Sequence, residues 1–320
     1  TVSFVPTLVR ILRNQRYDAI ILYSVPTNGW QTVIVARLMG VPVIFRALDA
    51  SHLIRKTVFR RLVLAAERFV YRRVSWLSAN NPVLLEYCRK NGAQPETSSV
   101  DYPGLDPNQF RRRARNRDLQ AKLHIRDGEK VLVFLGTLFT FCGLDRVMSD
   151  LAQQDARHLN LKVMIIGDGD LQQTLKNQVK SYEIESKVIF LGRIEFEQLG
   201  EYLSFADVAM MPFEAEAVAE LALPWKVFQY LAAELPVVAT PLKGLMSVIP
   251  PGGGVAYLDS GENSVRRMYD LACNRDECIR MVGRGTELLN RDFLWESNVV
   301  HFENRIYGVV REFRKGRDSS

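Results

Sequence analysis

Lys226 raises a chemical question because it lies two residues after Pro224 in the segment LPWKVFQYL (223–231). Proline suits the first turn of a helix, where a backbone N–H group has no intrahelical partner. A cation in that turn opposes the positive end of the helix dipole unless an anion offsets it. Lys226 therefore either reaches into solvent or belongs to a helix start that holds a phosphate or a carboxylate.

Two glycine-containing turns also follow predicted strands. In GTLFTFCG, Gly136 ends a strand and Gly143 precedes a helix, which allows the backbone to come close to a ligand. Tight strand-to-helix turns also need glycine for steric reasons alone, so both interpretations stay open. In GDGDL (167–171), we expect Asp170 to cap the following helix rather than to catalyse.

The acidic loop FEAEAVAELALPWK (213–226) ends at Lys226 and carries three glutamates, Glu220 among them. Such a loop, leading to a helix start with a lysine, could bind the hydroxyls of a sugar and the phosphates of a nucleotide together. In GRIEFEQL (192–199), Arg193 could stack on a ligand or pair with it. A solvated surface position is the alternative for each of these side chains.

The loop RALDASHLIRK (46–56) is unusual in the first half of the chain, because Arg46, Asp49 and His52 follow a predicted strand. These side chains are candidates for proton or phosphate chemistry. His52 could act as a general base only if it faces a ligand crevice. A histidine that is merely hydrogen-bonded is the alternative.

The segment that follows, within residues 55–73, has the pattern of an amphipathic helix with a strongly basic face. Apolar residues recur at helical spacing, and five arginines surround them: Arg60, Arg61, Arg68, Arg72 and Arg73. A core-facing helix with a solvated face accounts for this pattern. Contact with an anionic membrane surface is the alternative, which positive charge together with exposed apolar area would favour.

In the second half, short apolar runs alternate with longer helical patterns. The predicted strands are VLVFLG (131–136), LKVMIIG (161–167), KVIFLG (187–192), DVAMMPF (207–213), PVVAT (236–240) and GGGVAYLD (252–259). Continuous apolar strands between helices indicate a parallel sheet covered on both faces. Such a sheet binds ligands outside the carboxyl ends of its strands, which is where the loops described above lie.

The first half repeats the pattern with fewer strands, namely YDAIILYS (17–24), VPVIFRA (41–47), VSWLSA (74–79) and SSVDYP (98–103). We therefore predict an α/β protein with two Rossmann-like, doubly wound domains that face each other across a cleft. The small number of strands in the first domain allows for a further strand and helix upstream of Thr1. We expect this domain to span 1–108, a basic linker 109–127 and the second domain 128–299.

Composition supports a globular protein with room for two domains, because the chain has 320 residues, of which 47% are hydrophobic and 24% charged. No apolar run approaches the roughly 18 residues that span a bilayer, and the start lacks the layout of a secretory signal. The four cysteines and four histidines match no common zinc or redox spacing. We expect no metal site and free thiols in a reducing compartment.

Charge is distributed unevenly along the chain. Residues 1–120 hold 19 Lys and Arg against 8 Asp and Glu, whereas residues 121–320 hold 23 against 28. The first half is therefore a candidate for an anionic partner. Nucleic acid is not the partner we expect, because the sequence has no interleaving of aromatic with basic residues and no recognisable reading motif.

Taken in order, these segments resemble the large group of retaining, nucleotide-sugar-dependent glycosyltransferases of group 1 (family 4), whose two Rossmann-like domains define the GT-B fold. The resemblance covers nearly the whole chain. Its motifs are YDAIILYS, ARLMGVPVIF, YPGLDPNQF, FLGTL…CGLD, VMIIGDGDL, VIFLGRI, FADVAMMPF, LPWKVFQYLAAELPVVAT and FLWESNVVHFENRIYGVV. Each motif is weak alone, and the ordered set is specific.

The resemblance implies roles for individual residues. The family's P-x-K-x-x-E-Y helix start is matched at three positions, Pro224, Lys226 and Tyr230. Lys226 would by similarity help to bind the donor diphosphate. Gly136 and Thr137 would approach the phosphates or the transferred sugar, and the loop at Gly192 and Arg193 would border the base.

Several family positions carry other residues in this chain. The ribose-binding glutamate falls on Gln229, which can still hydrogen-bond a hydroxyl. The earlier donor-contacting glutamate falls on or beside Leu221, next to Glu220. The Arg and Lys of the motif G-R-x-x-x-x-K-G fall on Thr137 and Cys142, so two phosphate-binding cations are absent.

In the first domain, the histidine of the family's H-D loop falls on Leu48, with Asp49 retained and His52 nearby. Asp49 and His52 are therefore the candidate catalytic residues. The candidate donor-binding residues are Gly136, Thr137, Arg193, Glu220, Lys226 and Gln229. The family's final helix crosses back onto the first domain, which would place residues 300–320 there.

The resemblance implies a hexosyltransferase-like enzyme that moves a sugar, with retention, from a nucleotide-diphosphate-sugar donor to a glycan, lipid-linked or other acceptor. It implies no cofactor beyond the donor. Because several donor contacts are replaced, the alternative is a catalytically inactive scaffold or regulatory subunit. Transfer depends more on electrostatic stabilisation of the leaving diphosphate than on a strong base, and Lys226 and helix N-termini could supply it. We expect a cytoplasmic protein, peripheral on the inner face of a membrane if the basic helix binds lipid.

Overall fold

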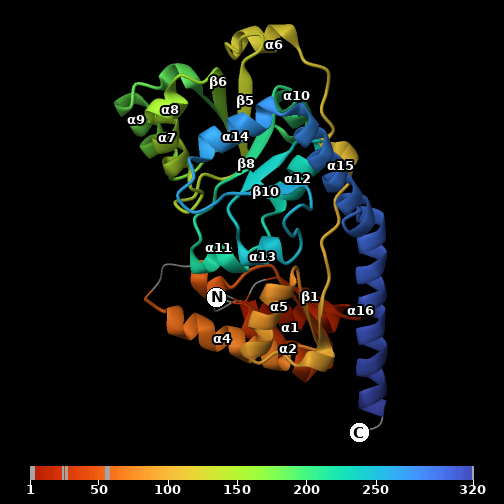
Figure 1. The fold of residues 1–320 in the computed structure, drawn as a ribbon. Coiled ribbons are helices and arrows are strands. Elements are labelled where there is room, and N and C mark those ends of the chain that lie inside the picture. The colour runs from red at the N-terminus through yellow and green to blue at the C-terminus, as the bar shows by residue number, and fades with distance from the viewer. Residues whose placement is uncertain (1–3, 24, 26–27, 55–57, 319–320) are drawn as a thin grey trace.

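The computed structural model describes residues 4–23, 25, 28–54 and 58–318. Its strands form two parallel sheets, one built from the first hundred residues and the other from residues 130–257. Figure 1 shows the two sheets at opposite ends of the molecule, each accompanied by helices. The α/β class predicted from the alternating strand and helix patterns is confirmed.

The first sheet has the order β1-β2-β3-β4, and every neighbouring pair is parallel. Its strands are β1 (Ile20–Leu22), β2 (Val43–Ala47), β3 (Trp76–Ala79) and β4 (Ser98–Val100). Each lies within a predicted segment, and Ser24 of the segment 17–24 lies outside the described residues. All five residues of β2 are buried, which is why this strand reads as a nearly continuous apolar run.

The elements around this sheet are α1 (Phe4–Asn14), α2 (Gly29–Met39), α3 (Ser51–Ile54), α4 (Arg60–Arg73), α5 (Pro82–Lys90) and the 3-10 turn η1 (Pro95–Thr97). The start of α5 shows how the sequence sets a boundary. The Asn81 side chain accepts a hydrogen bond from the Leu84 N–H group at 2.9 Å, and Pro82 occupies the first helical position. The loop that carries Asp49 and His52 leads from β2 into α3.

The second sheet has the order β10-β9-β8-β5-β6-β7, again with every pair parallel. Its strands are β5 (Lys130–Leu135), β6 (Leu161–Ile166), β7 (Val188–Gly192), β8 (Val208–Met211), β9 (Val237–Ala239) and β10 (Val255–Tyr257). From β5 the chain adds β6 and β7 on one side, and it then returns to add β8, β9 and β10 on the other. The strand order therefore reverses between β5 and β8, which is where an open α/β sheet binds its ligand.

The elements that connect these strands are α7 (Leu144–Ala152), α8 (Gln154–Arg157), α9 (Gln172–Ser181), η3 (Glu185–Lys187), η4 (Phe196–Gln198), α10 (Leu199–Leu203), α11 (Ala217–Leu221), α12 (Trp225–Ala232), α13 (Lys243–Met246) and α14 (Ser264–Cys273). Helix α12 buries Phe228 and Tyr230 completely. The Tyr230 hydroxyl accepts a hydrogen bond from the Leu135 N–H group at 2.7 Å. This bond holds α12 against the end of β5.

The basic segment between the sheets lies along the second half of the molecule. It contains η2 (Pro107–Phe110) and α6 (Arg117–Lys122). Arg112 and Arg115 donate to the Ser204 carbonyl at 3.3 and 3.0 Å. Arg113 donates to the Glu197 carbonyl at 2.8 Å. Part of the positive charge of the first 120 residues is therefore engaged by backbone carbonyls.

Helices α15 (Arg275–Asp292) and α16 (Trp295–Asp318) return the chain to the first sheet. Leu105 donates to the Phe293 carbonyl at 2.8 Å and accepts from the Trp295 N–H group at 3.0 Å. The two segments that cross between the halves are therefore paired with each other. The Arg305 guanidinium lies 4.6 Å from the centre of the Trp76 ring, and Figure 1 shows α16 running beside the first half.

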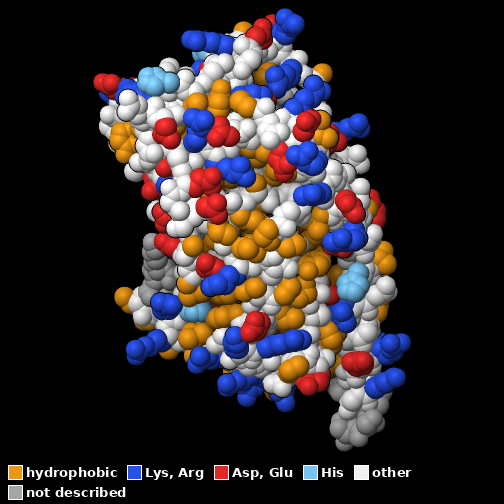
Figure 2. Space-filling view, in the orientation of Figure 1, with side chains coloured by type: hydrophobic (Ala, Val, Ile, Leu, Met, Phe, Trp, Pro, Cys, Tyr) orange, Lys and Arg blue, Asp and Glu red, His pale blue; other side chains and the backbone are white. Residues whose placement is uncertain are grey.

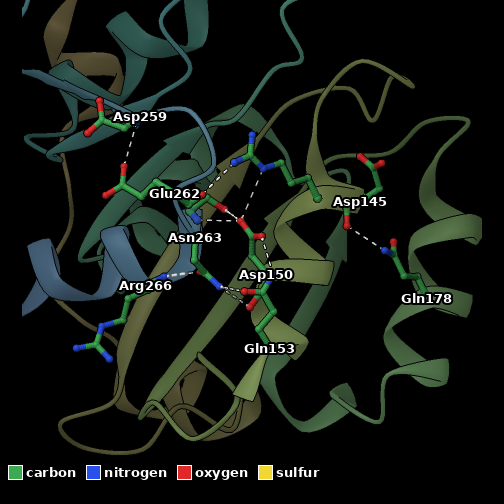
Figure 3. Close-up of polar contacts among 10 residues, drawn as sticks. Asp145, Asp150, Gln153, Gln178, Asp259, Glu262, Asn263 and Arg266 are labelled. Atoms are coloured by element: carbon green, nitrogen blue, oxygen red, sulfur yellow. Dashed lines mark hydrogen bonds and ion pairs between the residues drawn. The ribbon is translucent and has the colours of Figure 1, made fainter. Parts of the chain in front are cut away.

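A buried carboxylate joins α7 to α14 (Figure 3). Asp150 of α7 accepts hydrogen bonds from the N–H and hydroxyl groups of Ser264, the first residue of α14, at 2.8 and 2.5 Å. Asn263 accepts from the Arg266 N–H group at 2.9 Å and donates to the Asp150 carbonyl at 3.0 Å. The negative charge of Asp150 thus lies at the positive end of the α14 dipole and satisfies its backbone donor.

Replacing Asp150 by Ala should lower the free energy of unfolding by about 2–3 kcal/mol, because buried donors of Ser264 lose their acceptor. Urea unfolding followed by far-UV circular dichroism measures the difference. Asp270→Ala is the control, because it removes a half-exposed carboxylate paired with Arg266 on α14. The control should cost less than about 1 kcal/mol, and equal losses in the two variants would contradict this role of Asp150.

Candidate functional site

A cavity of ≈ 820 Å³ lies outside the carboxyl ends of β5 and β8, between the two halves of the molecule. The loop after β5 and the segment from Phe213 to Gln229 form most of its wall. Leu48, Asp49 and Leu53 contribute the wall from the first half. The lining is mainly apolar and aromatic, and its charged side chains are Asp49, Asp170, Glu216 and Lys226. Loops that lie far apart in the sequence therefore face one cavity.

Lys226 is the one cationic side chain among the described residues that line this cavity. Its Nζ lies 4.5 Å from the centre of the Phe134 ring and 4.6 Å from that of Phe213. Burial lowers the pKa of the ammonium to about 8, and Cys142 opposes this effect. No carboxylate of the described residues pairs with Lys226, so its charge is not compensated within that part of the chain.

Gly136 ends β5 in a conformation that makes room for this lysine. Its φ of +140° is one that residues with a side chain rarely adopt. A Cβ atom there would lie 2.5 Å from Nζ of Lys226 and 2.9 Å from its Cε. Glycine at this position therefore leaves the space that the end of the lysine side chain occupies.

The start of α12 adds to the positive potential of the cavity. Pro224 is the N-cap residue of α12, and its side chain makes no capping hydrogen bond. The positive end of the helix dipole and the Lys226 ammonium thus lie together, and no carboxylate in the described part of the chain pairs with that ammonium. Lys226 is half-buried rather than extended into solvent, so the second of the two alternatives considered for it, a helix start that holds an anion, is favoured.

A second cavity of ≈ 440 Å³ adjoins the first, and Gly136 and Thr137 line both. It lies at the carboxyl ends of β5, β6 and β7, and its polar lining includes Asp168 and Arg193. An elongated anionic ligand that spans the two cavities would meet Lys226 in one and Arg193 in the other. The structure therefore brings five of the six candidate donor-binding residues to one continuous crevice, and Glu220 is the exception.

Of these candidates, Gln229 and Glu220 are placed differently. Gln229 lines the first cavity. Glu220 lines neither cavity, because its carboxylate accepts from the Lys243 N–H group at 3.2 Å and pairs with the Lys243 ammonium at 3.6 Å. Glu216, from the same acidic loop, lines the first cavity instead. A donor-contacting role for Glu220 stays a prediction.

Asp49 and His52 share a loop but have different surroundings. Asp49 lines the cavity, and burial raises the pKa of its carboxyl, opposed by a hydrogen bond from Ser51. His52 is buried away from the lining, and its Nδ1 lies 2.7 Å from Oε2 of Glu67. Glu67 is completely buried and also accepts from the His52 N–H group at 3.1 Å. The condition that His52 face the crevice is not met at this cavity, and the alternative of a hydrogen-bonded histidine fits its surroundings.

Sequence reasoning missed the aromatic part of the wall. Phe139 and Phe141 stack with ring centres 5.2 Å apart, and Phe141 packs edge-on against Phe213 at 5.3 Å. The F-T-F spacing after β5 was the available signal. The capping role expected of Asp170 is wrong, because α9 starts after Leu171 without a side-chain cap, and Asp170 lines the first cavity instead.

Two family models match the chain. The model of the glycosyl transferases group 1 matches residues 115–276, which is about half of the chain, and that of the glycosyl transferase 4-like domain matches residues 1–100. The chain is 28% identical over 170 residues to an uncharacterized glycosyltransferase of Methanocaldococcus jannaschii, covering 51% of this chain and 41% of that protein. It is 25% identical over 204 residues to N-acetyl-alpha-D-glucosaminyl L-malate synthase of Bacillus anthracis, covering 62% and 51%. The chain thus spans about half the length of the curated relatives it matches.

Solved structures share the fold. HepE of Anabaena in complex with UDP superposes with a TM-score of 0.73 at 16% identity, covering 99% of this chain and 82% of that chain. Sucrose-phosphate synthase of Thermosynechococcus elongatus superposes with a TM-score of 0.77 at 16% identity, covering 99% and 78%. These likenesses confirm the predicted GT-B fold. With the family match over half of its length, the chain belongs to the glycosyl transferases of group 1.

Proposed function

We propose that the chain is a retaining glycosyltransferase that binds a nucleoside-diphosphate sugar at the carboxyl ends of β5 and β8 and transfers the sugar to a glycan, lipid-linked or other hydroxyl acceptor. The observation that carries the proposal is the half-buried Lys226 ammonium at the start of α12, which has no carboxylate partner among the described residues. A diphosphate would supply the missing negative charge. The UDP in the HepE complex supports this ligand class.

In this proposal, Lys226 acts on the leaving group. Negative charge builds on the diphosphate as the bond between sugar and phosphate breaks, and a preorganised ammonium in a water-poor site stabilises that charge. The rings of Phe134 and Phe213 hold the ammonium in place without neutralising it. Lys226 and the α12 dipole thus supply part of the positive charge that Thr137 and Cys142 do not carry.

Asp49 is the residue that we assign to the acceptor. It reaches the cavity from the first half, whereas Lys226 reaches it from the second. A carboxylate whose pKa is raised by burial is a stronger base than an exposed one. In the proposed reaction, Asp49 orients the acceptor hydroxyl and receives its proton.

Thermal unfolding in the presence of UDP, GDP, ADP and their common sugar conjugates tests the donor class. A ligand that binds the folded state stabilises it by about 2.7 kcal/mol at a hundred times its Kd. We expect one base to raise the Tm and the other two to leave it unchanged. If none of them shifts the Tm of folded protein, the inactive scaffold or regulatory subunit becomes the better account.

Nucleotide binding should weaken above about pH 8, because the Lys226 ammonium has a pKa of about 8 and loses its proton there. The diphosphate binds the charged form and raises this pKa again, so binding at about pH 9 takes up a proton and binding below about pH 7 takes up none through this group. Calorimetry in two buffers of different ionisation enthalpy measures the uptake. If nucleotide binding to Lys226→Met takes up as many protons at about pH 9 as binding to wild type, a group other than Lys226 is responsible for the uptake.

Helix α4 carries a basic and partly apolar surface. A groove along it is lined by Arg61, Leu64, Ala65, Arg68, Phe69, Arg72 and Arg73. Val58 and Leu62 are 93% and 66% exposed. Figure 2 shows Lys and Arg side chains among hydrophobic ones at the end of the molecule where Figure 1 places α2 and α4. Residues 55–57, which the sequence included in this surface, lie outside the described residues.

This surface fits the head groups of an anionic membrane, because it combines positive charge with exposed apolar area. Within the described ranges, no helix has both the length and the apolar character that crossing a bilayer requires. We propose that the α4 surface docks peripherally, which would bring the first half of the cavity wall towards a lipid-linked acceptor.

Reversing two charges of α4, in the double variant Arg60→Glu and Arg61→Glu, should weaken binding to anionic vesicles by at least about 30-fold, because each basic residue near the surface contributes about 1 kcal/mol. Sedimentation with vesicles that contain phosphatidylglycerol, compared with phosphatidylcholine alone, measures binding. Lys176→Glu with Lys180→Glu, on the exposed face of α9, makes the same charge change and is the matched control. Equal binding by the two double variants would remove α4 from the interaction.

A further inference from the structure

Two asparagines at the carboxyl end of β3 connect the two walls of the first cavity. Asn80 donates from Nδ2 to the Leu48 carbonyl at 3.1 Å, on the loop that carries Asp49. Asn81 donates from Nδ2 to Oδ1 of Asn80 at 2.8 Å and to the Leu221 carbonyl at 3.0 Å. A line of three hydrogen bonds therefore runs from the loop after β2 in the first half to the end of α11 in the second.

Both ends of this line belong to the cavity wall. Leu48 lines the cavity, and Leu221 lies between two residues that line it, Ala219 and Ala222. The Leu221 side chain packs against the core of the first half. Within the described ranges, the bond from Asn81 to Leu221 is the one hydrogen bond that joins residues 4–100 directly to residues 128–292.

The residue type at position 81 is informative. Asn80 and Asn81 are 6% and 0% exposed, so water does not replace their partners readily. Asn81 caps α5 with its side-chain oxygen. Capping needs only an oxygen, which serine or aspartate would supply equally well. The amide nitrogen of Asn81 takes no part in the cap, and this is the atom that reaches Leu221.

We infer that Asn80 and Asn81 form a relay that couples the donor side of the cavity to its acceptor side. The assignment of donor and acceptor to these two sides rests on the proposed function. A nucleotide that contacts the segment from Glu216 to Lys226 restrains Leu221. The relay passes that restraint to the loop of Leu48 and Asp49. Asn81 is thus a positioning residue, which orders the acceptor wall when the donor site is occupied.

Hydrogen exchange followed by mass spectrometry, without nucleotide and with UDP, GDP or ADP, tests the relay in three variants. Asn81→Ser keeps the cap of α5 and removes both bonds that the Asn81 amide donates. Asn80→Ser removes the bond to Leu48 and the amide oxygen that accepts from Asn81, and it leaves the bond between Asn81 and Leu221. Asn274 caps α15 in the same way, so Asn274→Ser is the matched control.

Without nucleotide, exchange at residues 217–223 should be about five- to tenfold faster in Asn81→Ser, as the loss of one buried hydrogen bond implies. Asn274→Ser should exchange there as wild type does. In wild type, a bound nucleotide should slow exchange at residues 136–143 and at residues 46–54. Asn80→Ser and Asn81→Ser should retain the first protection and lose the second.

The relay is overturned if Asn81→Ser leaves exchange at residues 217–223 unchanged, or if both variants retain nucleotide-dependent protection of residues 46–54. If nucleotide does not protect residues 136–143 of wild type from exchange, that result counts against the proposed function alone. The nucleotide-free comparison of Asn81→Ser with wild type at residues 217–223 still decides whether Asn81 holds α11. If Asn81→Ser does not fold, Asn80→Ser decides, since a correct relay requires it to lose the protection of residues 46–54.

Discussion

Replacing Lys226 by Met should weaken nucleoside-diphosphate binding by about 30- to 100-fold and leave the folded state at least as stable as wild type. Methionine keeps an apolar chain against the rings of Phe134 and Phe213 and removes the charge. A charge-assisted contact to phosphate contributes about 2.0–2.7 kcal/mol, which sets the expected loss. The folded state does not suffer, because the ammonium is desolvated without a carboxylate partner. Titration calorimetry gives the affinity, and urea unfolding gives the stability.

Lys243→Met is the matched control for this experiment. Lys243 is exposed on α13, pairs with Glu220 and lines neither cavity. We expect this variant to bind the nucleotide as wild type does. Unchanged affinity in Lys226→Met would remove Lys226 from the donor site. Equal weakening in both variants would point to the total charge of the protein rather than to a local contact.

Replacing Gly167 by Ala should lower the free energy of unfolding by about 3–5 kcal/mol and abolish nucleotide binding at concentrations that saturate wild type. Gly167 follows β6 with a φ of +138°. A Cβ atom there would lie 1.9 Å from the Gly136 carbonyl oxygen, and no side-chain rotation relieves an overlap with backbone. The carboxyl ends of β5 and β6 would have to separate, and these ends build the crevice. Urea unfolding and calorimetry measure the two effects.

Gly192→Ala is the control for Gly167→Ala, because it adds a methyl group at a positive φ without an overlap with neighbouring atoms. Gly192 ends the next strand, β7, with a φ of +66°, and a Cβ atom there meets nothing within 4 Å. Only the cost of a left-handed conformation remains, which is about 1 kcal/mol. If Gly167→Ala costs no more than this variant, the close approach of Gly167 to Gly136 does not matter for stability.

The strands could be predicted from the sequence because burial on both faces of a parallel sheet leaves a continuous apolar run. Their ends could be predicted less well, since pairing decides them. The run DVAMMPF extends to Phe213, but β8 ends at Met211, where Pro212 can no longer donate a hydrogen bond to the neighbouring strand. The order of the strands required the tertiary structure.

The part of the site that could be predicted follows from topology. Gly136, Thr137 and Lys226 meet because they lie at the carboxyl end of β5 and at the start of the helix held against it. The sequence could not predict whether Glu216 or Glu220 lines the cavity, because this depends on how the neighbours of α11 orient that helix. The Glu220 carboxylate accepts a hydrogen bond from the N–H group of Lys243, which lies more than twenty residues further along the chain, and it therefore does not reach the cavity.

The surroundings of His52 were hidden from the sequence for a similar reason. Its partner Glu67 is fifteen residues away, on α4, and is buried although the helix around it is strongly basic. From the sequence alone, a glutamate among the arginines of α4 is expected on the solvated face of the helix. Only the packing of α3 against α4 shows that it turns inward to accept hydrogen bonds from His52.

A crystal structure with a bound nucleoside-diphosphate sugar, of the base that thermal unfolding selects, tests the central claim most directly. We predict diphosphate oxygens at about 2.7–3.1 Å from Nζ of Lys226, at the start of α12. We also predict that the base lies beside Arg193 in the adjoining cavity. A nucleotide bound elsewhere, such as on the arginines of α4, with the crevice at Gly136 and Lys226 left empty, would contradict the central claim.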